Sequence, residues 1–180
     1  MRIKVEHYNR RWPQDFERIS SDLRDALAGV EVLGIEHVGS TSVPGLAAKP
    51  VIDVDIVVGV DAVENAIAAL ERADYVHLGE MGVPDRHAFE APGSPRRNVY
   101  VTVDGSLALR NHLTVRDVLR TDAAAREEYG SLKLRLAERD WETIDHYVEA
   151  KSAFLQRILQ RSGLTKDELT TIEETNRPTT

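Results

Sequence analysis

Two aspartates in a strongly apolar stretch are the residues of this 180-residue chain whose types and spacing most clearly point to chemistry. Residues 51–58 read VIDVDIVV, a composition typical of a β-strand. Side chains alternate along a strand, so Asp53 and Asp55 share one face. At a separation of ~6 Å and an effective dielectric constant of ~20, their repulsion is on the order of 3 kcal/mol, which favours a cation between them. The alternative is an edge strand whose polar face lies in water, where the repulsion is screened.

The residue types available restrict which cation this is. The chain has no cysteine, and its six histidines show no zinc-binding spacing. Oxygen ligands on one strand suit Mg²⁺, which takes one or two carboxylates and completes its shell with water and substrate phosphates. We therefore expect Mg²⁺, or Mn²⁺, held by Asp53 and Asp55.

A loop rich in glycine and hydroxyl residues precedes this strand. The run Gly39-Ser40-Thr41-Ser42 follows an aliphatic segment, and 12 residues separate Ser40 from Asp53. A Gly-Ser turn exposes backbone N–H groups and a hydroxyl that can bind phosphate oxygens. The loop therefore predicts a phosphate-binding turn.

The Gly-Ser turn followed by Asp-x-Asp resembles the defining pattern of the polymerase-beta-like nucleotidyltransferase superfamily. Within that superfamily, the run from His37 to Asp53, HVGSTSVPGLAAKPVID, resembles the signature of the GrpB family. Other landmarks of that family occur in order, and the resemblance covers roughly residues 3–160. These landmarks are Trp12-Pro13, Arg110-Asn111-His112-Leu113, the run from Val115 to Arg120, the run from Tyr129 to Lys133 and the run from Tyr147 to Lys151.

The resemblance implies a nucleotidyltransferase-like fold, with Asp53, Asp55 and Ser40 in the catalytic site. It also implies a link to coenzyme A metabolism, because the family is sometimes fused to dephospho-CoA kinase in bacteria. Active members of the superfamily usually carry a third carboxylate on a neighbouring strand. Asp104, at the end of the expected strand 97–103, is the candidate for it, although Asp104-Gly105 is also an ordinary turn sequence.

Basic residues in the second half of the chain are candidates for binding phosphate. Lys151 interrupts an otherwise apolar helical stripe, four residues from both Tyr147 and Leu155. It either reaches a substrate phosphate in the cleft of the two aspartates, or extends its stem to solvent or an ion pair. Lys49, Arg116 and Lys133 are comparable candidates, for which a solvated charge or a structural ion pair is the alternative. His37 and His112 are expected to be hydrogen-bonded structural residues.

The elements that position these residues indicate an α+β fold with a small mixed β-sheet flanked by helices, followed by a C-terminal helical bundle. We expect one domain over residues 1–163, with a sheet part at about 1–105, a helical part at about 106–163 and a tail at 164–180. Thr165 and Glu168 have the spacing of a capping box, which predicts a short helix in the tail. The expected strands are 30–38, 51–58, 75–78, 86–90 and 97–103, and the expected helices run from about 13 to 28, 61–73, 107–120, 121–138 and 141–161.

Composition narrows the class of protein. Apolar residues make up 42% of the chain and charged residues 29%, which is typical of a globular protein. The start lacks the apolar core of an export signal, so a cytoplasmic protein is expected. A net charge of -7 opposes binding to a long nucleic acid, and nothing indicates a membrane.

Two functions remain open on these grounds. The first is a Mg²⁺-dependent nucleotidyltransferase that binds a nucleoside triphosphate or a related phosphorylated molecule and transfers a nucleotidyl group to an unknown acceptor. The second is a catalytically silent nucleotide- or metabolite-binding module with the same cleft. A purely structural partner domain gives no reason for two aligned aspartates.

Overall fold

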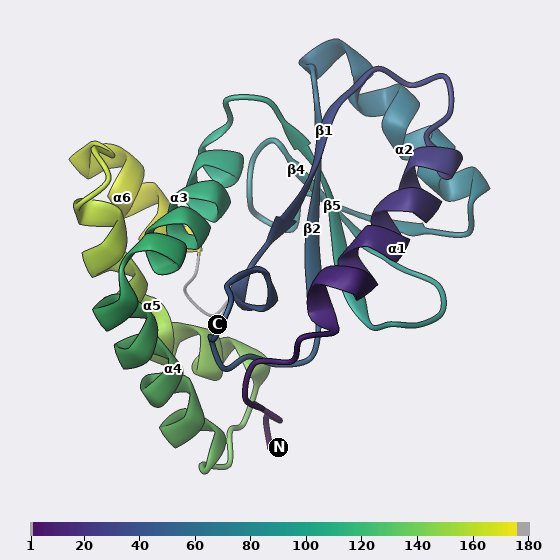
Figure 1. The fold of residues 1–180 in the computed structure, drawn as a ribbon. Coiled ribbons are helices and arrows are strands. Elements are labelled where there is room, and N and C mark those ends of the chain that lie inside the picture. The colour runs from purple at the N-terminus through teal and green to yellow at the C-terminus, as the bar shows by residue number, and fades with distance from the viewer. Residues whose placement is uncertain (1, 176–180) are drawn as a thin grey trace.

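A computed structural model describes residues 2–175 and contains one mixed β-sheet with helices on both faces (Figure 1). Residues 176–180, the end of the predicted tail, lie outside the described residues. The strand order is β1-β2-β5-β4-β3, in which β2 and β5 are parallel and all other neighbours are antiparallel. The strands are β1 (Val32–Val38), β2 (Ile52–Val58), β3 (Val76–Gly79), β4 (Arg86–Glu90) and β5 (Arg97–Val103).

The apolar face of the sheet is covered by the first two helices. They are α1 (Trp12–Ala26) and α2 (Val63–Arg72), the latter preceded by the 3₁₀ turn η2 (Val60–Ala62). Ile52, Val54 and Ile56 of β2 are 0–2% exposed and pack in one cluster with Leu23 of α1 and Leu70 of α2. Because side chains alternate along β2, the aspartates between these residues face the other side of the sheet.

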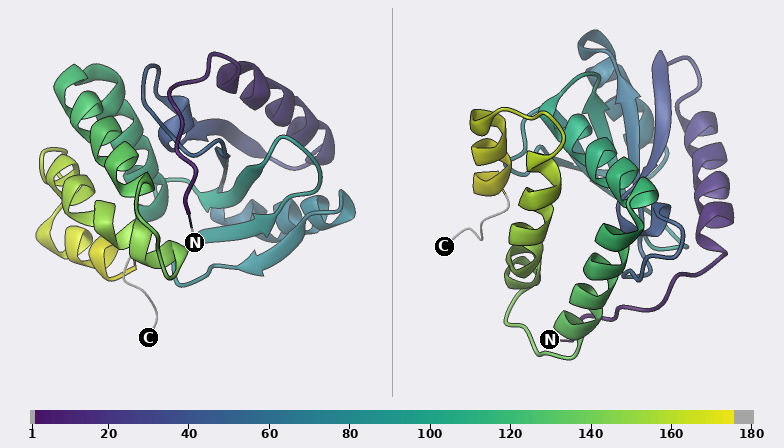
Figure 2. Two further views of the ribbon diagram at one scale, coloured as in Figure 1. Left: turned by 90° about the horizontal axis from the view of Figure 1, so that it is seen from below. Right: turned by 60° about the vertical axis from the view of Figure 1, so that its left-hand side comes forward.

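The helical half of the chain lies on that other side (Figures 1 and 2). It consists of α3 (Leu107–Thr121), α4 (Ala123–Ala137), α5 (Ile144–Gln160) and α6 (Lys166–Thr175). A second core cluster joins α3, α4 and α5 to the loop after β1. The expected architecture, a small mixed sheet with flanking helices and a C-terminal helical region, is therefore confirmed.

Helix α6 confirms the helix predicted in the tail. The Thr165 backbone N–H donates to Glu168 Oε2 at 2.8 Å, and the Glu168 N–H donates to Thr165 Oγ1 at 3.2 Å, which is the reciprocal pattern of a capping box. Ile172 packs the helix onto its neighbours and is 6% exposed. An ion pair between Arg110 of α3 and Glu168, 2.6 Å long, fixes it further.

Two predicted elements differ from those observed. The helix expected from Trp141 begins at Ile144, because Thr143 is the capping residue and accepts from the His146 N–H. Trp141 instead donates its indole N–H to the Leu136 carbonyl at the end of α4. The loop at Ser40–Ser42, predicted to be irregular, forms a short 3₁₀ turn, η1. No helix within residues 2–175 is long and apolar enough to cross a membrane.

Candidate functional site

The two aspartates lie in the centre of the sheet, because β2 is hydrogen-bonded to β1 on one side and β5 on the other. Asp53 is opposite Asn98 and Asp55 is opposite Tyr100 on β5. Asp55 is 0% exposed, whereas Asp53 is half-buried. The edge-strand alternative is therefore wrong, and the shared face predicted for the aspartates is buried beneath the helical half.

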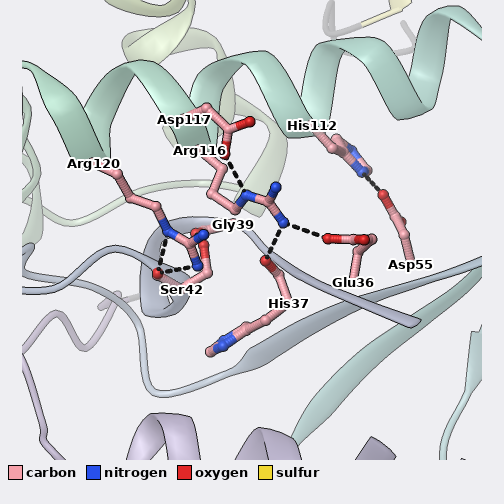
Figure 3. A network of polar contacts seen from close by, with 9 residues as sticks. All are labelled: Glu36, His37, Gly39, Ser42, Asp55, His112, Arg116, Asp117 and Arg120. Carbon is pink, nitrogen blue, oxygen red and sulfur yellow. Dashed lines mark hydrogen bonds and ion pairs between the residues drawn. The ribbon is translucent and has the colours of Figure 1, made fainter. Parts of the chain in front are cut away.

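Asp55 is paired with His112 of α3 (Figure 3). His112 Nδ1 donates to Asp55 Oδ2 at 2.7 Å. Burial by itself would lower the pKa of His112, but the Asp55 carboxylate more than offsets this effect, so the pKa is raised. A histidine from another element thus lies against one of the two aspartates, and its protonated form offsets their mutual repulsion. The expectation that His112 is a hydrogen-bonded residue is correct, but its partner is one of the two key aspartates.

Asp53 lies against Gly39 and β5. Asp53 Oδ1 accepts from the Asn98 side-chain amide at 2.7 Å. A Cβ atom on Gly39 would lie 2.1 Å from Asp53 Oδ2, so the glycine is needed for this close approach. Burial raises the pKa of the Asp53 carboxyl, while Asn98 and His112 act in the opposite direction.

Three residues of the predicted phosphate-binding turn line the cavity, and the fourth, Ser42, forms a hydrogen bond within the turn. Gly39, Ser40 and Thr41 line the same cavity as Asp53. Thr41 is 1% exposed, and its hydroxyl donates to the Val51 carbonyl at 3.3 Å. Ser42 faces away from this cavity and donates its hydroxyl to the Gly39 carbonyl at 2.6 Å. Ser42 therefore shapes the turn, and a direct phosphate contact is not supported for it.

Lys49, Lys133 and Lys151 line the cavity, and each has a lowered pKa. Lys133 is 2% exposed, and its Nζ atom has no hydrogen-bond partner among residues 2–175. Burial, and then the nearby Lys151, lowers its pKa well below the ordinary value. Burial and the nearby Lys49 lower the pKa of Lys151 to about 8, against the opposing effect of Asp53.

Lys151 and Lys133 each lie over an aromatic ring. Lys151 Nζ is 4.4 Å from the centre of the Tyr147 ring, and Lys133 Nζ is 4.4 Å from the centre of the Tyr129 ring. The prediction that Lys151 lines a cleft with Asp53 is confirmed by this geometry. Asp55 is not part of the cavity wall, because it is buried beneath it.

Two predicted site residues, Arg116 and Asp104, do not line this cavity. Arg116 Nη1 is 2.6 Å from Glu36 Oε2, and Arg116 Nε is 2.7 Å from Asp117 Oδ1 (Figure 3), which is the structural ion pair given as the alternative. Asp104 follows the end of β5 and is exposed in a turn. Since Tyr100 is level with Asp55, Asp104 lies about 13 Å further along the strand. It is not a third ligand beside the aspartates, and the turn interpretation is correct.

The cavity has a volume of about 330 Å³ and lies between the sheet, the η1 turn, α4 and α5. Among residues 2–175, no group of three or more His, Asp or Glu side chains is arranged to hold a metal ion. A Mg²⁺ ion nevertheless needs only one or two carboxylates when water and substrate phosphates complete its shell. The residues fit an ion held by Asp53 and a bound phosphate. Asp55 is 0% exposed; its Oδ2 atom is bonded to His112, while its Oδ1 atom is buried without a hydrogen-bond partner among residues 2–175.

Comparison with known proteins gives a family match over most of the chain. Residues 2–161 match the family described as GrpB protein. The chain belongs to the GrpB family. The GrpB structure from Enterococcus faecalis superposes with a TM-score of 0.76 and 32% identity, covering 94% of this chain and 99% of that one.

Some relatives of this GrpB chain have names that state no reaction, and one is named as a kinase. A UPF0157 protein of Halalkalibacterium halodurans is 36% identical over 165 residues, covering 91% of this chain and 84% of that protein. A protein named dephospho-CoA kinase from Mycolicibacterium paratuberculosis is 31% identical over 179 residues, covering 84% of this chain and 44% of that protein. Family membership therefore establishes the fold and leaves the chemistry to the site.

His112 and Asn98 are the site residues whose importance sequence reasoning underestimated. His112 is 57 residues from Asp55 and Asn98 is 45 residues from Asp53, so neither pairing leaves a local pattern. The signal that was present is electrostatic, because a carboxylate in an aliphatic strand requires a partner. The motif Arg110-Asn111-His112-Leu113 contained that partner.

Proposed function

We propose that the cavity binds a nucleoside triphosphate, or a related phosphorylated small molecule, through its phosphate groups. The observation that carries this proposal is Lys133, an amine that is 2% exposed, lines the cavity and has no hydrogen-bond partner among the described residues. A buried donor left without a partner costs about 1–3 kcal/mol. A bound anion would remove that cost.

The surroundings of Lys133 support an anion rather than a neutral ligand. Lys49 and Lys151 line the same cavity; after burial, the nearby Lys151 lowers the pKa of Lys133, and the nearby Lys49 lowers the pKa of Lys151. Asp53 compensates for part of this charge and leaves a surplus of positive charge. Phosphate groups concentrate negative charge and acceptor oxygens, so they match three lysines beside the exposed backbone of a Gly-Ser turn.

Replacing Lys151 with methionine is expected to weaken tripolyphosphate binding by about 10- to 100-fold, because a charge-assisted hydrogen bond contributes about 1.5–3 kcal/mol. Wild-type affinity should fall as pH rises through about 8, where Lys151 loses its proton, and this dependence should flatten in Lys151→Met. Isothermal titration calorimetry between pH 7 and 9 measures both effects. Lys166→Met, at an exposed position on α6, is the control. Equal affinity of Lys151→Met and the wild type would contradict the proposal.

Replacing Lys133 with methionine is expected to have opposite effects on stability and binding. The free energy of unfolding should rise by about 1–3 kcal/mol, because an unpartnered buried amine is replaced by an apolar side chain of similar length. Tripolyphosphate affinity should fall at the same time. Urea unfolding and calorimetry on the same preparation separate the two. A variant that is less stable but binds normally would show that Lys133 supports the fold rather than the ligand.

Nucleotidyl transfer is the second candidate function, favoured by the presence of Asp53 beside Ser40 in one cavity. This assignment extends the resemblance to the nucleotidyltransferase superfamily. Asp53 would hold Mg²⁺ or Mn²⁺, which would supply electrostatic stabilisation to the phosphate charge when bound. The lysines and the Ser40 turn would orient the triphosphate. Opposite Asp53, strand β5 carries Asn98 rather than a carboxylate. Pyrophosphate release from a nucleoside triphosphate would support transfer, and binding without release would support the silent module.

The choice of ligands for these experiments follows from the charge of the cavity and the relatives of the chain. A thermal-shift series with ATP, tripolyphosphate and dephospho-CoA, with and without Mg²⁺, tests the phosphate proposal. Dephospho-CoA is included because a relative is named dephospho-CoA kinase, which motivates the proposed link to coenzyme A metabolism. A ligand that binds the native state alone raises apparent stability. No shift with any of the three would contradict the proposal.

A further inference from the structure

A second cavity of about 250 Å³ lies on the far side of His112. Helix α6 forms one wall through Thr171, Ile172 and Thr175, and the loop at residues 83–85 with the first residue of β4, Arg86, forms another. Helix α3 completes it. Because the family match ends at residue 161, the α6 wall belongs to a segment outside the part of the chain that defines the family.

The second cavity and the lysine-lined site share lining residues with a third cavity that lies between them. An intermediate cavity of about 240 Å³ contains Ser40, Asp53 and Lys151, which also line the first site. The same intermediate cavity contains Asn111, His112 and Ile172, which also line the second. Pockets for ligands of ordinary size measure about 300–1,000 Å³. The second cavity is therefore the right size for one part of a ligand whose charged part lies among the lysines.

The walls of this second cavity are chemically unlike the lysine-lined site. Val83, Pro84, Leu107 and Ile172 offer apolar surface, and lysine is absent from the lining. The Asn111 side chain offers both a hydrogen-bond donor and an acceptor. Asp85 and Arg86 in the lining carry opposite charges. Arg86 Nε is buried without a hydrogen-bond partner among residues 2–175. Such a surface suits a flat, uncharged ring with apolar faces and polar edges.

We infer that the second cavity binds the base of the nucleoside triphosphate whose phosphates occupy the lysine-lined site, with α6 as its outer wall. This inference rests on the proposed function, because the phosphates anchor the ligand. Asn111 and Arg86 would hydrogen-bond the polar edge of the ring, and Ile172 would pack on its face. The C-terminal segment thus determines which nucleotide the site accepts, while the lysines determine that it accepts a triphosphate.

The test compares ATP with inorganic tripolyphosphate, which has the phosphates and no base. Ile172→Trp fills the second cavity from α6, and Val83→Trp fills it from the opposite wall. Each variant should lose at least tenfold in ATP affinity while tripolyphosphate affinity stays within about twofold. Ile172→Leu preserves the size of the side chain and serves as the control. Thermal unfolding confirms that each variant remains folded, and the two opposite walls keep the test independent of one substitution.

The outcomes separate this inference from the proposed function. ATP affinity that falls in both tryptophan variants, with tripolyphosphate affinity unchanged, supports the base site. If the wild type binds tripolyphosphate as tightly as ATP, or if both variants bind ATP normally, the base site is overturned and the phosphate site stands. If the variants lose both ligands equally, the cavity does not distinguish the base and the inference also falls. A wild type that binds neither ligand overturns both proposals.

Discussion

Replacing Asp55 with alanine is expected to lower the free energy of unfolding by about 3–5 kcal/mol, the range for removing one partner of a buried ion pair. Asp55 is 0% exposed and its Oδ2 atom is 2.7 Å from His112 Nδ1. Its removal leaves His112 without the acceptor and the charge that raise its pKa. Asp55→Asn keeps an acceptor oxygen of similar geometry and should lose less. Urea unfolding of both variants measures the difference.

A double-mutant cycle with His112→Ala tests whether the cost comes from this pair. The two single substitutions should be strongly non-additive, with a coupling energy of about 1–3 kcal/mol, because each one leaves its partner uncompensated. Simple additivity would show that the two side chains contribute independently and would contradict the pairing.

The pH dependence of stability follows from the same pair. The pKa of His112 in the folded protein is raised above 6.5, so the pair contributes its full stabilisation below pH 6.5. That contribution is lost as pH rises through the folded pKa. The stability difference between the wild type and Asp55→Ala should therefore shrink from pH 6 towards alkaline pH.

Replacing Gly39 with alanine is expected to lower the free energy of unfolding by about 2–6 kcal/mol and to abolish ligand binding. Gly39 has φ 68° and ψ -174°, a region that is essentially restricted to glycine and costs about 1–3 kcal/mol for other residues. The added Cβ would also lie 2.1 Å from Asp53 Oδ2 and 3.0 Å from Asp53 Cβ, and such crowding typically costs about 1–3 kcal/mol. Asp53 cannot yield freely, because it also accepts from Asn98.

The matched control for Gly39 is Gly59→Ala. Gly59 has φ -68°, and an added Cβ there would meet nothing within 4 Å, so stability and binding should be unchanged. Thermal unfolding and ATP titration of both variants provide the comparison. Normal binding by a folded Gly39→Ala variant would show that the close approach of Gly39 to Asp53 is not needed for the site.

Local patterns predicted the elements and the direction in which several side chains point. Alternation along residues 51–58 placed Asp53 and Asp55 on one face, and the apolar stripe around Lys151 placed that lysine towards the sheet. These predictions depend on the repeat of a single strand or helix, and the structure agrees with them. The Gly-Ser turn was predicted for a similar reason, since its composition restricts its backbone.

Charge balance inside the site could not be predicted in this way. The repulsion between the aspartates indicated a cation, and a metal ion was the simplest choice from residues near in sequence. The partner that the structure places on Asp55 is His112, which α3 brings onto the polar face of the sheet. The sequence determined that the buried aspartates need a polar or charged partner, and only the packing of α3 decided that His112 is the partner of Asp55.

Strand order decided the remaining part of the site. Because β5 lies beside β2 in parallel, Asn98 is opposite Asp53, whereas Asp104 extends past the end of the paired strands. The burial of Lys133 likewise depends on how α4 packs, since a lysine in a helix sequence is ordinarily assigned to the surface. The sequence by itself thus determined the family, the elements and the face of each strand, because these are local properties. Only the tertiary structure decided which residues from separate elements meet, because strand register and helix packing are set by contacts across the whole core.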